Sequence, residues 1–270
     1  PLEIESATGL SVYSTIPFSP LQEAKSASIR AGARGITLLA QSNPQDPAIE
    51  SLRSLRTALQ FALLESNSNV VMMTGPTPGV GKSFVSLNFA DVLASGGKKI
   101  LLVDADLHRG YLHEHLGIGR QNGLSEILAS SVTFGDVVHR NYGSGFDFIS
   151  TGSLPPNAAE LLMVSQFKRS LDEWSQAYDL VIVDTPPVLS LSDAQVIGAN
   201  SGIIFLVTRA ELNTIGEVKE SIRRMSQVGL KIKGVVFNGL KLRAGRYGYG
   251  SKYGRFRYAR YAYYSYKNEE

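Results

Sequence analysis

The feature that most constrains this chain is the run from Val70 to Ser83, where an apolar strand leads into a glycine-rich loop and then into Lys-Ser at a helix start. Backbone N–H groups can close around phosphate oxygens in such a loop because glycine has no Cβ, and the helix N-terminus adds a favourable dipole. Lys82 is predicted to reach the β- and γ-phosphates, and Ser83 to ligate magnesium. The strict motif spacing would put its first glycine where Pro76 stands, so Gly75 lies one residue early. A chance glycine turn is disfavoured because strand, loop, Gly-Lys-Ser and helix occur together.

Short apolar runs alternate with helix-length stretches along most of the chain, which is typical of an α/β fold with a parallel sheet and helices on both faces. The apolar runs do not alternate cleanly with polar residues, as expected of strands buried on both faces. We predict strands over Val70–Thr74, Lys99–Asp104, Phe146–Ser150, Leu180–Asp184, Gly202–Val207 and Ile232–Phe237. We predict helices over Ala48–Glu65, Ser83–Ala94, Leu124–Leu128, Ala158–Ala177, Asp193–Ala199 and Ile215–Val228.

The sequence divides into three segments. Residues 1–47 carry scattered prolines and two strand-like pieces, Leu10–Ile16 and Gly35–Ala40, and are predicted to be a leader packed on the surface of the domain. Residues 48–240 form the α/β domain with the phosphate loop. Residues 241–270 are rich in Gly, Arg and Tyr and have few aliphatic side chains, so burial cannot offset chain entropy and a flexible tail is expected.

The composition excludes several kinds of functional site and shows where the charge of the chain lies. The absence of cysteine excludes disulfides, cysteine-ligated zinc and a thiol nucleophile. The net charge of +3 divides into +6 from Lys241 onward and −3 before it, so the basic character belongs to the tail. No run approaches the roughly 20 apolar residues that cross a bilayer. Because the chain begins with Pro1 rather than methionine, we expect a fragment from which a membrane segment has been cut away.

Carboxylates end two of the predicted strands. Asp104 and Asp106 follow one apolar run, and Asp184 ends another. In an open parallel sheet the ligand lies beyond the carboxyl ends of the strands, so these acids should converge on the phosphate loop. Magnesium takes oxygen ligands, and one or two carboxylates with Ser83 and phosphate oxygens suffice. A lone Asp after a strand is usually a turn or cap residue, but the accompanying loop favours a metal site.

At this point the sequence resembles the deviant-loop P-loop ATPases of septum placement and DNA segregation, the MinD/ParA-like superfamily. It resembles more closely the bacterial tyrosine kinases of exopolysaccharide and capsule export, the BY-kinases. The family's Walker A, Walker A′ and Walker B motifs fall at Gly75–Ser83, Leu101–Asp106 and Val181–Pro187. The lysine that the division and partition ATPases place early in the loop would fall at Thr77 and is absent. The basic residue usual after Walker A′ is replaced by His108, followed by Arg109.

Three further features resemble the kinase branch. Glu50, Arg53 and Arg56 match the family's E-x-x-R-x-x-R stripe, which implies ring assembly. The leader phrase from Gly9 to Pro17 resembles the segment after the family's second transmembrane helix. The tail holds eight of the twelve tyrosines, which the resemblance implies are phosphoacceptors: Tyr247, Tyr249, Tyr253, Tyr258, Tyr261, Tyr263, Tyr264 and Tyr266.

The resemblance implies an ATP- and Mg²⁺-dependent protein-tyrosine autokinase that phosphorylates its tail in trans and so regulates exopolysaccharide polymerisation and export. Asp104 would accept the proton of the incoming hydroxyl, and Lys82 and Asp106 would be the other catalytic residues. Magnesium would be held by Ser83 and Asp184, with Asp106 in its outer shell. Nucleotide-binding residues would be Gly75, Thr77, Pro78, Gly79, Val80, Gly81, Lys82, Ser83, Phe84 and Asn238.

The resemblance also implies partners and a location. A homo-oligomeric ring, an octamer in the family, would assemble at the cytoplasmic face of the bacterial inner membrane. A transmembrane activator segment or protein and a cognate tyrosine phosphatase are expected, and no nucleic acid.

Other interpretations stay open from the residues themselves. The chain could be a MinD/ParA-like ATPase switch whose basic tail binds nucleic acid or a partner, because interleaved Arg and Tyr suit phosphate contact and base stacking. The Glu50, Arg53 and Arg56 stripe could be a solvated helix face. Asn238 could merely turn the chain after the last strand.

Overall fold

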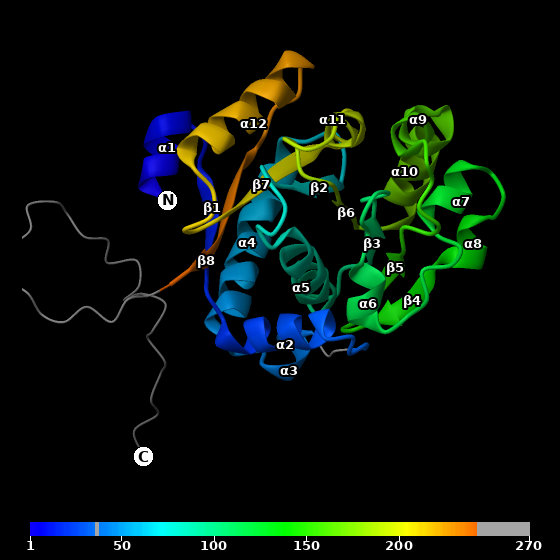
Figure 1. The fold of residues 1–270 in the computed structure, drawn as a ribbon, viewed down its shortest axis with the longest axis horizontal. Coiled ribbons are helices and arrows are strands. Elements are labelled where there is room, and N and C mark those ends of the chain that lie inside the picture. Colours follow the sequence, from blue (N-terminus) through cyan, green and yellow to red (C-terminus); the bar gives the residue numbers. More distant parts are fainter. Residues whose placement is uncertain (36–37, 242–270) are drawn as a thin grey trace, which may run out of the picture.

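The computed structural model describes residues 1–35 and 38–241, in which eight strands form one sheet (Figure 1). The strand order is β1-β8-β7-β2-β6-β3-β5-β4. Neighbouring strands pair in parallel except β4 and β5, which are antiparallel. The strands are β1 Val12–Pro17, β2 Val70–Thr74, β3 Ile100–Asp104, β4 His139–Tyr142, β5 Phe146–Ile149, β6 Leu180–Asp184, β7 Ile203–Arg209 and β8 Gly234–Leu240.

Helices cover both faces of the sheet, as predicted. Within β2, Val71 and Met73 pack in one core cluster with α4 and α5, whereas Val70 and Met72 pack in the other with α10, α11 and α12. This division follows from the alternation of side chains along a strand. The helices are α1 Leu2–Thr8, α2 Pro20–Arg30, α3 Leu39–Ser42, α4 Pro47–Leu64, α5 Lys82–Ala94, α6 Leu112–Leu116, α7 Leu124–Leu128, α8 Phe134–Val137, α9 Ala158–Met163, α10 Ser165–Ala177, α11 Asp193–Gly198 and α12 Ile215–Gln227.

The six predicted strands are all present, but the sheet is mixed rather than wholly parallel. The strand that we did not predict is β4, a short edge strand whose residues are half-buried or exposed. It forms a hairpin with β5 through a turn in which Gly143 and Gly145 adopt positive φ. Because the strand is four residues long and polar, it carries no apolar run that could have indicated it.

The leader contributes directly to the sheet. β1 pairs in parallel with β8, with Val12 opposite Val235, and its Ile16 is fully buried. The strand-like piece predicted at Gly35–Ala40 is wrong where it is described, because α3 begins at Leu39; residues 36–37 lie outside the described part.

The sequence also missed α1, α2 and α8, and one predicted helix needed correction. α2 was not predicted, although its start carries a recognisable signal: the Ser19 hydroxyl accepts from the Gln22 N–H, and Pro20 occupies the first helical position. The predicted helix Ala158–Ala177 is two helices, because Val164 between them is extended (φ −68°, ψ 148°). The apolar spacing of residues 158–177 continues through Val164, so the sequence pattern did not reveal the break.

α4 is positioned by its own cap and by a buried apolar stripe. The Asp46 carboxylate accepts from the Ala48 N–H, and Leu52, Leu55 and Leu59 are buried against the sheet. The opposite face of the helix stays exposed and carries Glu50. Among the described residues no helix combines the length and apolar character needed to cross a bilayer.

Two leucines of α4 allow a matched test of this packing. Leu52 is fully buried, whereas Leu64 is 82 % exposed. We expect Leu52→Ala to lower the free energy of unfolding by about 2–5 kcal/mol through lost apolar contact and a residual cavity. Leu64→Ala should change it by less than about 0.5 kcal/mol. Urea denaturation measures both, and equal losses would contradict the packing described for α4.

Candidate active site

The phosphate loop joins β2 to α5, and its glycines are required by its geometry. Gly79 and Gly81 have φ of 80° and 93°, in the left-handed region that favours glycine. A Cβ at Gly75 would lie 2.6 Å from Val80 Cγ2 and 2.8 Å from the Val207 carbonyl oxygen, so the early glycine is needed where the loop leaves the strand. α5 begins directly at Lys82, so its N-terminus faces the loop.

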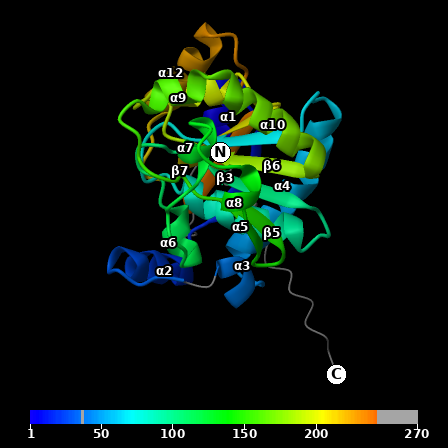
Figure 2. The same cartoon turned by 90° about the vertical axis from the view of Figure 1, so that its right-hand side faces the viewer.

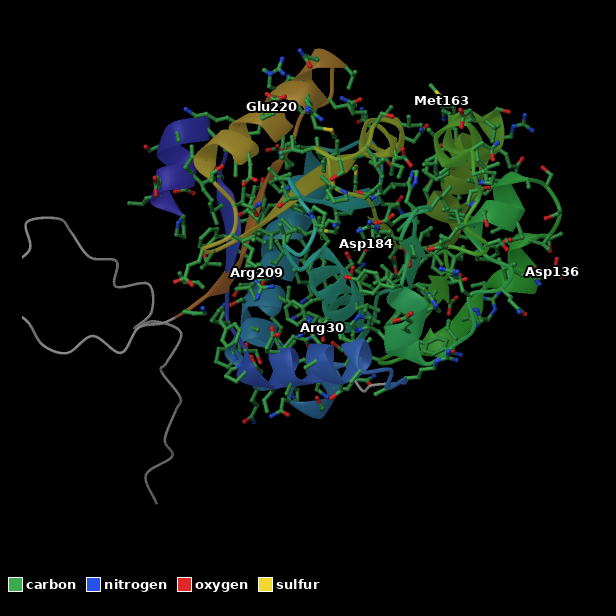
Figure 3. The ribbon with its side chains drawn as sticks, in the orientation of Figure 1. Arg30, Asp136, Met163, Asp184, Arg209 and Glu220 are labelled. Carbon is green, nitrogen blue, oxygen red and sulfur yellow. The ribbon has the colours of Figure 1, made fainter. Side chains whose placement is uncertain are left out.

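Asp184 lies at the carboxyl end of β6 and binds the first turn of α5. Its Oδ2 accepts from the Ser83 hydroxyl at 3.2 Å, and its Oδ1 accepts from the Ser86 hydroxyl at 2.7 Å. Figure 3 shows Asp184 near the middle of the molecule. Burial raises the pKa of Asp184 to about 6, although the positive charge of Lys82 opposes the shift. Ser83 and Asp184 thus lie together, as the sequence predicted for two magnesium ligands.

Asp104 lies beside Asp184, because the two residues are register partners on β3 and β6. Its carboxylate accepts from the Leu112 N–H at 3.1 Å and from the Asp106 N–H at 3.3 Å. Burial, together with the negative charge of Asp184, raises the pKa of Asp104 to about 8. The residue is 0 % exposed, and Gly110 packs so closely on it that a Cβ there would lie 2.9 Å from Asp104 Oδ1.

Asp106 is half-buried and shapes the turn after β3. Its Oδ1 accepts from the Arg109 N–H at 2.9 Å and from the His108 N–H at 3.3 Å. The His108 ring pairs with the buried Asp193 carboxylate at 3.0 Å. One oxygen of Asp106 therefore stabilises the turn, which is the usual role of an Asp that follows a strand. The Asp106 carboxylate also lies near the two buried carboxylates, because, beyond the effect of burial, its negative charge raises the pKa of both.

Tyr111 is a site residue that the sequence did not reveal. Burial raises its pKa; a hydrogen bond with Ser83 opposes that shift, and the negative charges of Asp184, Asp104 and Asp106 add to it. The phenol therefore lies near Ser83 and within electrostatic range of the three carboxylates, although the residue as a whole is 46 % exposed. No spacing rule connects a tyrosine in this turn with the phosphate loop. The candidate site thus contains a phenol of its own.

A pocket opens beside the loop, at the start of α5. One wall is formed by Gly81, Phe84 and Asn238, which the sequence had assigned to the nucleotide. The other wall comes from the leader and from the end of β7: Pro17, Phe18, Ser19, Gln22, Glu23, Ser26 and Arg209. Figure 2 shows α2, which carries part of this wall, beside α6 below the sheet. The leader residues had no sequence signal for a pocket, because they lie far from the loop along the chain.

Asn238 holds the loop from β8. Its Nδ2 donates to the Val80 carbonyl at 2.9 Å. A Cβ at Gly81 would lie 2.2 Å from that Nδ2, so glycine is required there for a second reason. With its nitrogen committed to Val80, the amide oxygen of Asn238 is an acceptor at the wall of the pocket.

The other predicted site residues lie apart from the phosphate loop. Arg53 forms an ion pair with Glu50 on α4. Arg56 donates to the Val92 carbonyl of α5 at 3.3 Å, so one member of the stripe contacts its own domain. The eight predicted acceptors, Tyr247, Tyr249, Tyr253, Tyr258, Tyr261, Tyr263, Tyr264 and Tyr266, lie outside the described residues.

The residues at the loop fit a magnesium ion by their chemistry. No group of three or more His, Asp or Glu side chains in the described ranges has the arrangement of a protein-only metal cage. Ser83 and Asp184 instead offer two hard oxygen donors at the helix that faces the phosphate loop. This is the donor set of a magnesium ion that takes its remaining ligands from phosphate and water.

Comparison with known proteins gives consistent results. Residues 68–232 match a family model described as an AAA domain. The putative tyrosine-protein kinase EpsB of Ralstonia solanacearum is 50 % identical over 263 residues, which are 97 % of this chain and 35 % of that protein. The chain therefore spans about a third of the length of this curated relative.

Solved structures show the same likeness. The kinase domain of the Escherichia coli tyrosine kinase ETK is 43 % identical with a TM-score of 0.85, covering 93 % of this chain and 99 % of that one. A cobyrinic acid a,c-diamide synthase of Mycobacterium smegmatis, solved with an ATP analogue and magnesium, shares the fold. It is 22 % identical with a TM-score of 0.53, and the match covers 63 % of this chain and 72 % of that one.

The raised pKa of Asp104 predicts how stability depends on pH. Its value is 3.8 in an ordinary environment and about 8 in the folded protein, so between these pH values the folded state binds more protons than the unfolded state. The free energy of unfolding of the metal-free protein should therefore fall as pH rises from 5.5 to 9. Asp104→Asn should reduce this fall in the free energy of unfolding. Part of the fall should remain in the variant, because the pKa of Asp184 is also raised.

Calorimetry in a chelator measures the effect. Asp104→Asn should raise Tm more at pH 9 than at pH 5.5, by about 2–4 °C for each kcal/mol of relieved charge burial. Asp172→Asn, which removes an exposed carboxylate on α10, is the matched control and should change Tm similarly at both values. An Asp104→Asn effect that is the same at pH 5.5 and pH 9 would contradict the burial of this charge.

Proposed function

The chain belongs to the bacterial tyrosine-protein kinase family, and we propose that it transfers phosphate from ATP to the tyrosines of its own tail, in the site of a neighbouring subunit. The observation that carries this proposal is the meeting of the phosphate-loop residues Lys82 and Ser83 with Asp184 and Asp104 at one edge of the sheet. The likeness of nearly the whole chain to the solved ETK kinase domain supports it.

Phosphoryl transfer requires positioning and charge neutralisation more than covalent chemistry. In the proposed mechanism the loop N–H groups hold the phosphates, and Lys82 contacts their β- and γ-oxygens. Ser83 and Asp184 would hold a magnesium ion, and Asp106 would belong to its outer shell. The ion would neutralise charge on the transferring phosphate. The described pairing of Ser83 with Asp184 supports this assignment.

Asp104 is the proposed acceptor of the tyrosine proton. A phenol has a pKa near 10, so an ordinary carboxylate orients it well but takes its proton late. The burial that raises the pKa of Asp104 to about 8 brings its proton affinity closer to that of the phenol. The positive charge of a bound magnesium ion would favour the ionised form in which Asp104 can accept the proton.

The position of the tail favours transfer between subunits. Lys241, the last described residue, pairs at 3.0 Å with Glu211 in the turn after β7, close to the phosphate loop. Tyr247 follows soon after Lys241 in the sequence, so little chain is available for this first tail tyrosine to reach the site of its own domain. Each phosphate adds about −1.5 to −2 charge, so several would reverse the +6 of the tail and favour separation of subunits.

The wider assignment follows from the family. We propose that a ring, an octamer in the family, assembles through Glu50, Arg53 and Arg56 at the cytoplasmic face of the inner membrane. Its phosphorylation cycle, with a transmembrane activator and a tyrosine phosphatase, would regulate exopolysaccharide polymerisation and export. The chain spans about a third of its curated relative, which supports a larger protein of which this is the kinase part.

Labelling with γ-labelled ATP tests the chemistry. Lys82→Met and Asp104→Asn should each reduce tyrosine labelling at least about 100-fold, because each removes charge placed at the transferring group. Lys168→Met, which removes an exposed lysine on α10, should leave labelling unchanged. Mass spectrometry should find the phosphates between Tyr247 and Tyr266. Full labelling in either site variant would refute its role, and salt-sensitive retention on DNA without phosphotyrosine would favour the ATPase switch.

A mixing experiment tests transfer in trans and the role of the stripe. A Lys82→Met chain, which keeps its tail tyrosines, is mixed with an active chain whose eight tail tyrosines are Phe. Phosphate should appear on the Lys82→Met chain. Arg53→Ala with Arg56→Ala in both chains should abolish the transfer and the oligomer seen by light scattering. Arg169→Ala on α10 is the matched control. A mixture that stays unlabelled would contradict transfer between subunits, and an intact oligomer would contradict the stripe.

A further inference from the structure

We infer that Asn213 and Arg209 are positioning residues that hold the phosphate loop in its phosphate-binding conformation. Arg209 is the last residue of β7, and Asn213 lies in the turn that joins β7 to α12; neither belongs to the nucleotide motifs. The inference rests on the proposed use of ATP and adds residues to the site that serves it.

Asn213 binds Thr77, and the direction of this hydrogen bond is fixed. Its Oδ1 accepts from the Arg209 backbone N–H at 2.9 Å, and an N–H can be accepted only by the oxygen of the amide. Its Nδ2 is therefore the donor to the Thr77 hydroxyl, at 2.8 Å. The first half of the loop is thus tied to the turn by a side-chain bond of defined polarity.

Arg209 holds the next part of the loop. Its Nη1 donates to the Gly79 carbonyl at 3.2 Å, and its Nη2 lies 4.0 Å from the Glu23 carboxylate of α2. Figure 3 shows Arg209 on the side of the molecule toward α2. In a planar trans peptide the C=O and the following N–H point in opposite directions. A carbonyl held outward at Gly79 therefore turns the Val80 N–H toward the inside of the loop.

The same geometry recurs at the following peptide. Asn238 Nδ2 holds the Val80 carbonyl at 2.9 Å, which turns the Gly81 N–H inward as well. Two successive N–H groups are thereby oriented before a phosphate arrives. Successive N–H groups in such a concavity are an anion-binding arrangement, so the side chains that fix the carbonyls contribute to affinity without touching the ligand.

The turn itself is rigid enough for this role. Arg209 O accepts from the N–H groups of Leu212 and Asn213 at 3.3 and 3.1 Å, and the Ala210 N–H donates to the Asn238 carbonyl at 2.9 Å. Glu211 has φ of 62°, a strained value for a residue with a side chain. Such strain persists where surrounding contacts determine the conformation. The turn is therefore a fixed support for the loop.

The bond also gives Thr77 a role. Thr77 stands at the position where the sequence resemblance places the early-loop lysine of the division and partition ATPases. Here the side chain at that position is short and is bound within its own domain by Asn213. Its function is therefore local: it fastens the loop on which the phosphates bind.

A double-mutant cycle on ATP binding tests the Asn213 bond. Affinity of the full chain for ATP with Mg²⁺ is measured by calorimetry for Asn213→Ala, Thr77→Val and the double variant. Each single change should weaken ATP binding about 3- to 10-fold, the range expected for one lost hydrogen bond. The double variant should be no weaker than either single one, and Thr77→Ser should bind like the wild type because it keeps the hydroxyl.

Arg209 is tested beside matched controls. Arg209→Ala should weaken ATP binding about 3- to 10-fold. Arg30→Ala removes an exposed partner of the same Glu23 carboxylate and should leave ATP affinity unchanged. Asn200→Ala removes an equivalent side-chain amide bond at the end of α11, to the Val196 carbonyl, and should also leave it unchanged.

The outcomes separate this inference from the proposed function. Additive losses in the cycle, or variants that lower Tm but bind ATP like the wild type, would overturn the positioning role. A wild-type chain that binds ATP, responds to the variants as expected and yet labels no tyrosine would overturn the kinase assignment and leave the positioning role supported. A wild-type chain that binds no ATP would overturn both.

Discussion

The pairing of β6 with β2 on one side and β3 on the other is the constraint on which the site depends. It places Asp184 opposite Met73, one residue before the end of β2, and opposite Asp104 at the end of β3. A parallel register brings the carboxyl ends of all three strands to one edge, so the loop and both carboxylates meet there without any contribution from long side chains. The hydroxyls of Ser83 and Ser86 then connect this edge to the start of α5.

This arrangement stores electrostatic cost in the metal-free protein. Burial raises the pKa of both carboxyls, to about 8 for Asp104, where the negative charge of Asp184 adds to the shift, and to about 6 for Asp184. Lys82 compensates part of this charge, and a magnesium ion would compensate more, so ligand binding and folding stability are linked at the same atoms. The buried carboxyls therefore lower the stability of the metal-free protein at the place where a cation and a phosphate would bind.

The sequence predicted those parts of the molecule that depend on local pattern. The six predicted apolar strands are all present and the phosphate loop joins β2 to α5, because buried strands and glycine-dependent loops leave direct signals in the sequence. β4 and the break at Val164 were missed, the first because a polar edge strand has no apolar run and the second because a single extended residue does not interrupt helical periodicity. Tyr111 and Asn213 could not be found either, since their roles arise from turns that bring distant segments together.

The loop is supported by three segments that are distant in sequence. The β7 turn holds it through Asn213 and Arg209, β8 holds it through Asn238, and α2 meets Arg209 through Glu23. β8 in turn pairs with β1, so the leader is bonded to the strand that positions Asn238, and Ile16 is the register partner of that residue. A displacement of the leader would therefore alter the wall of the pocket beside the phosphate loop and the support of the loop together. The leader lies outside the matched region of residues 68–232, yet it is structurally part of the site.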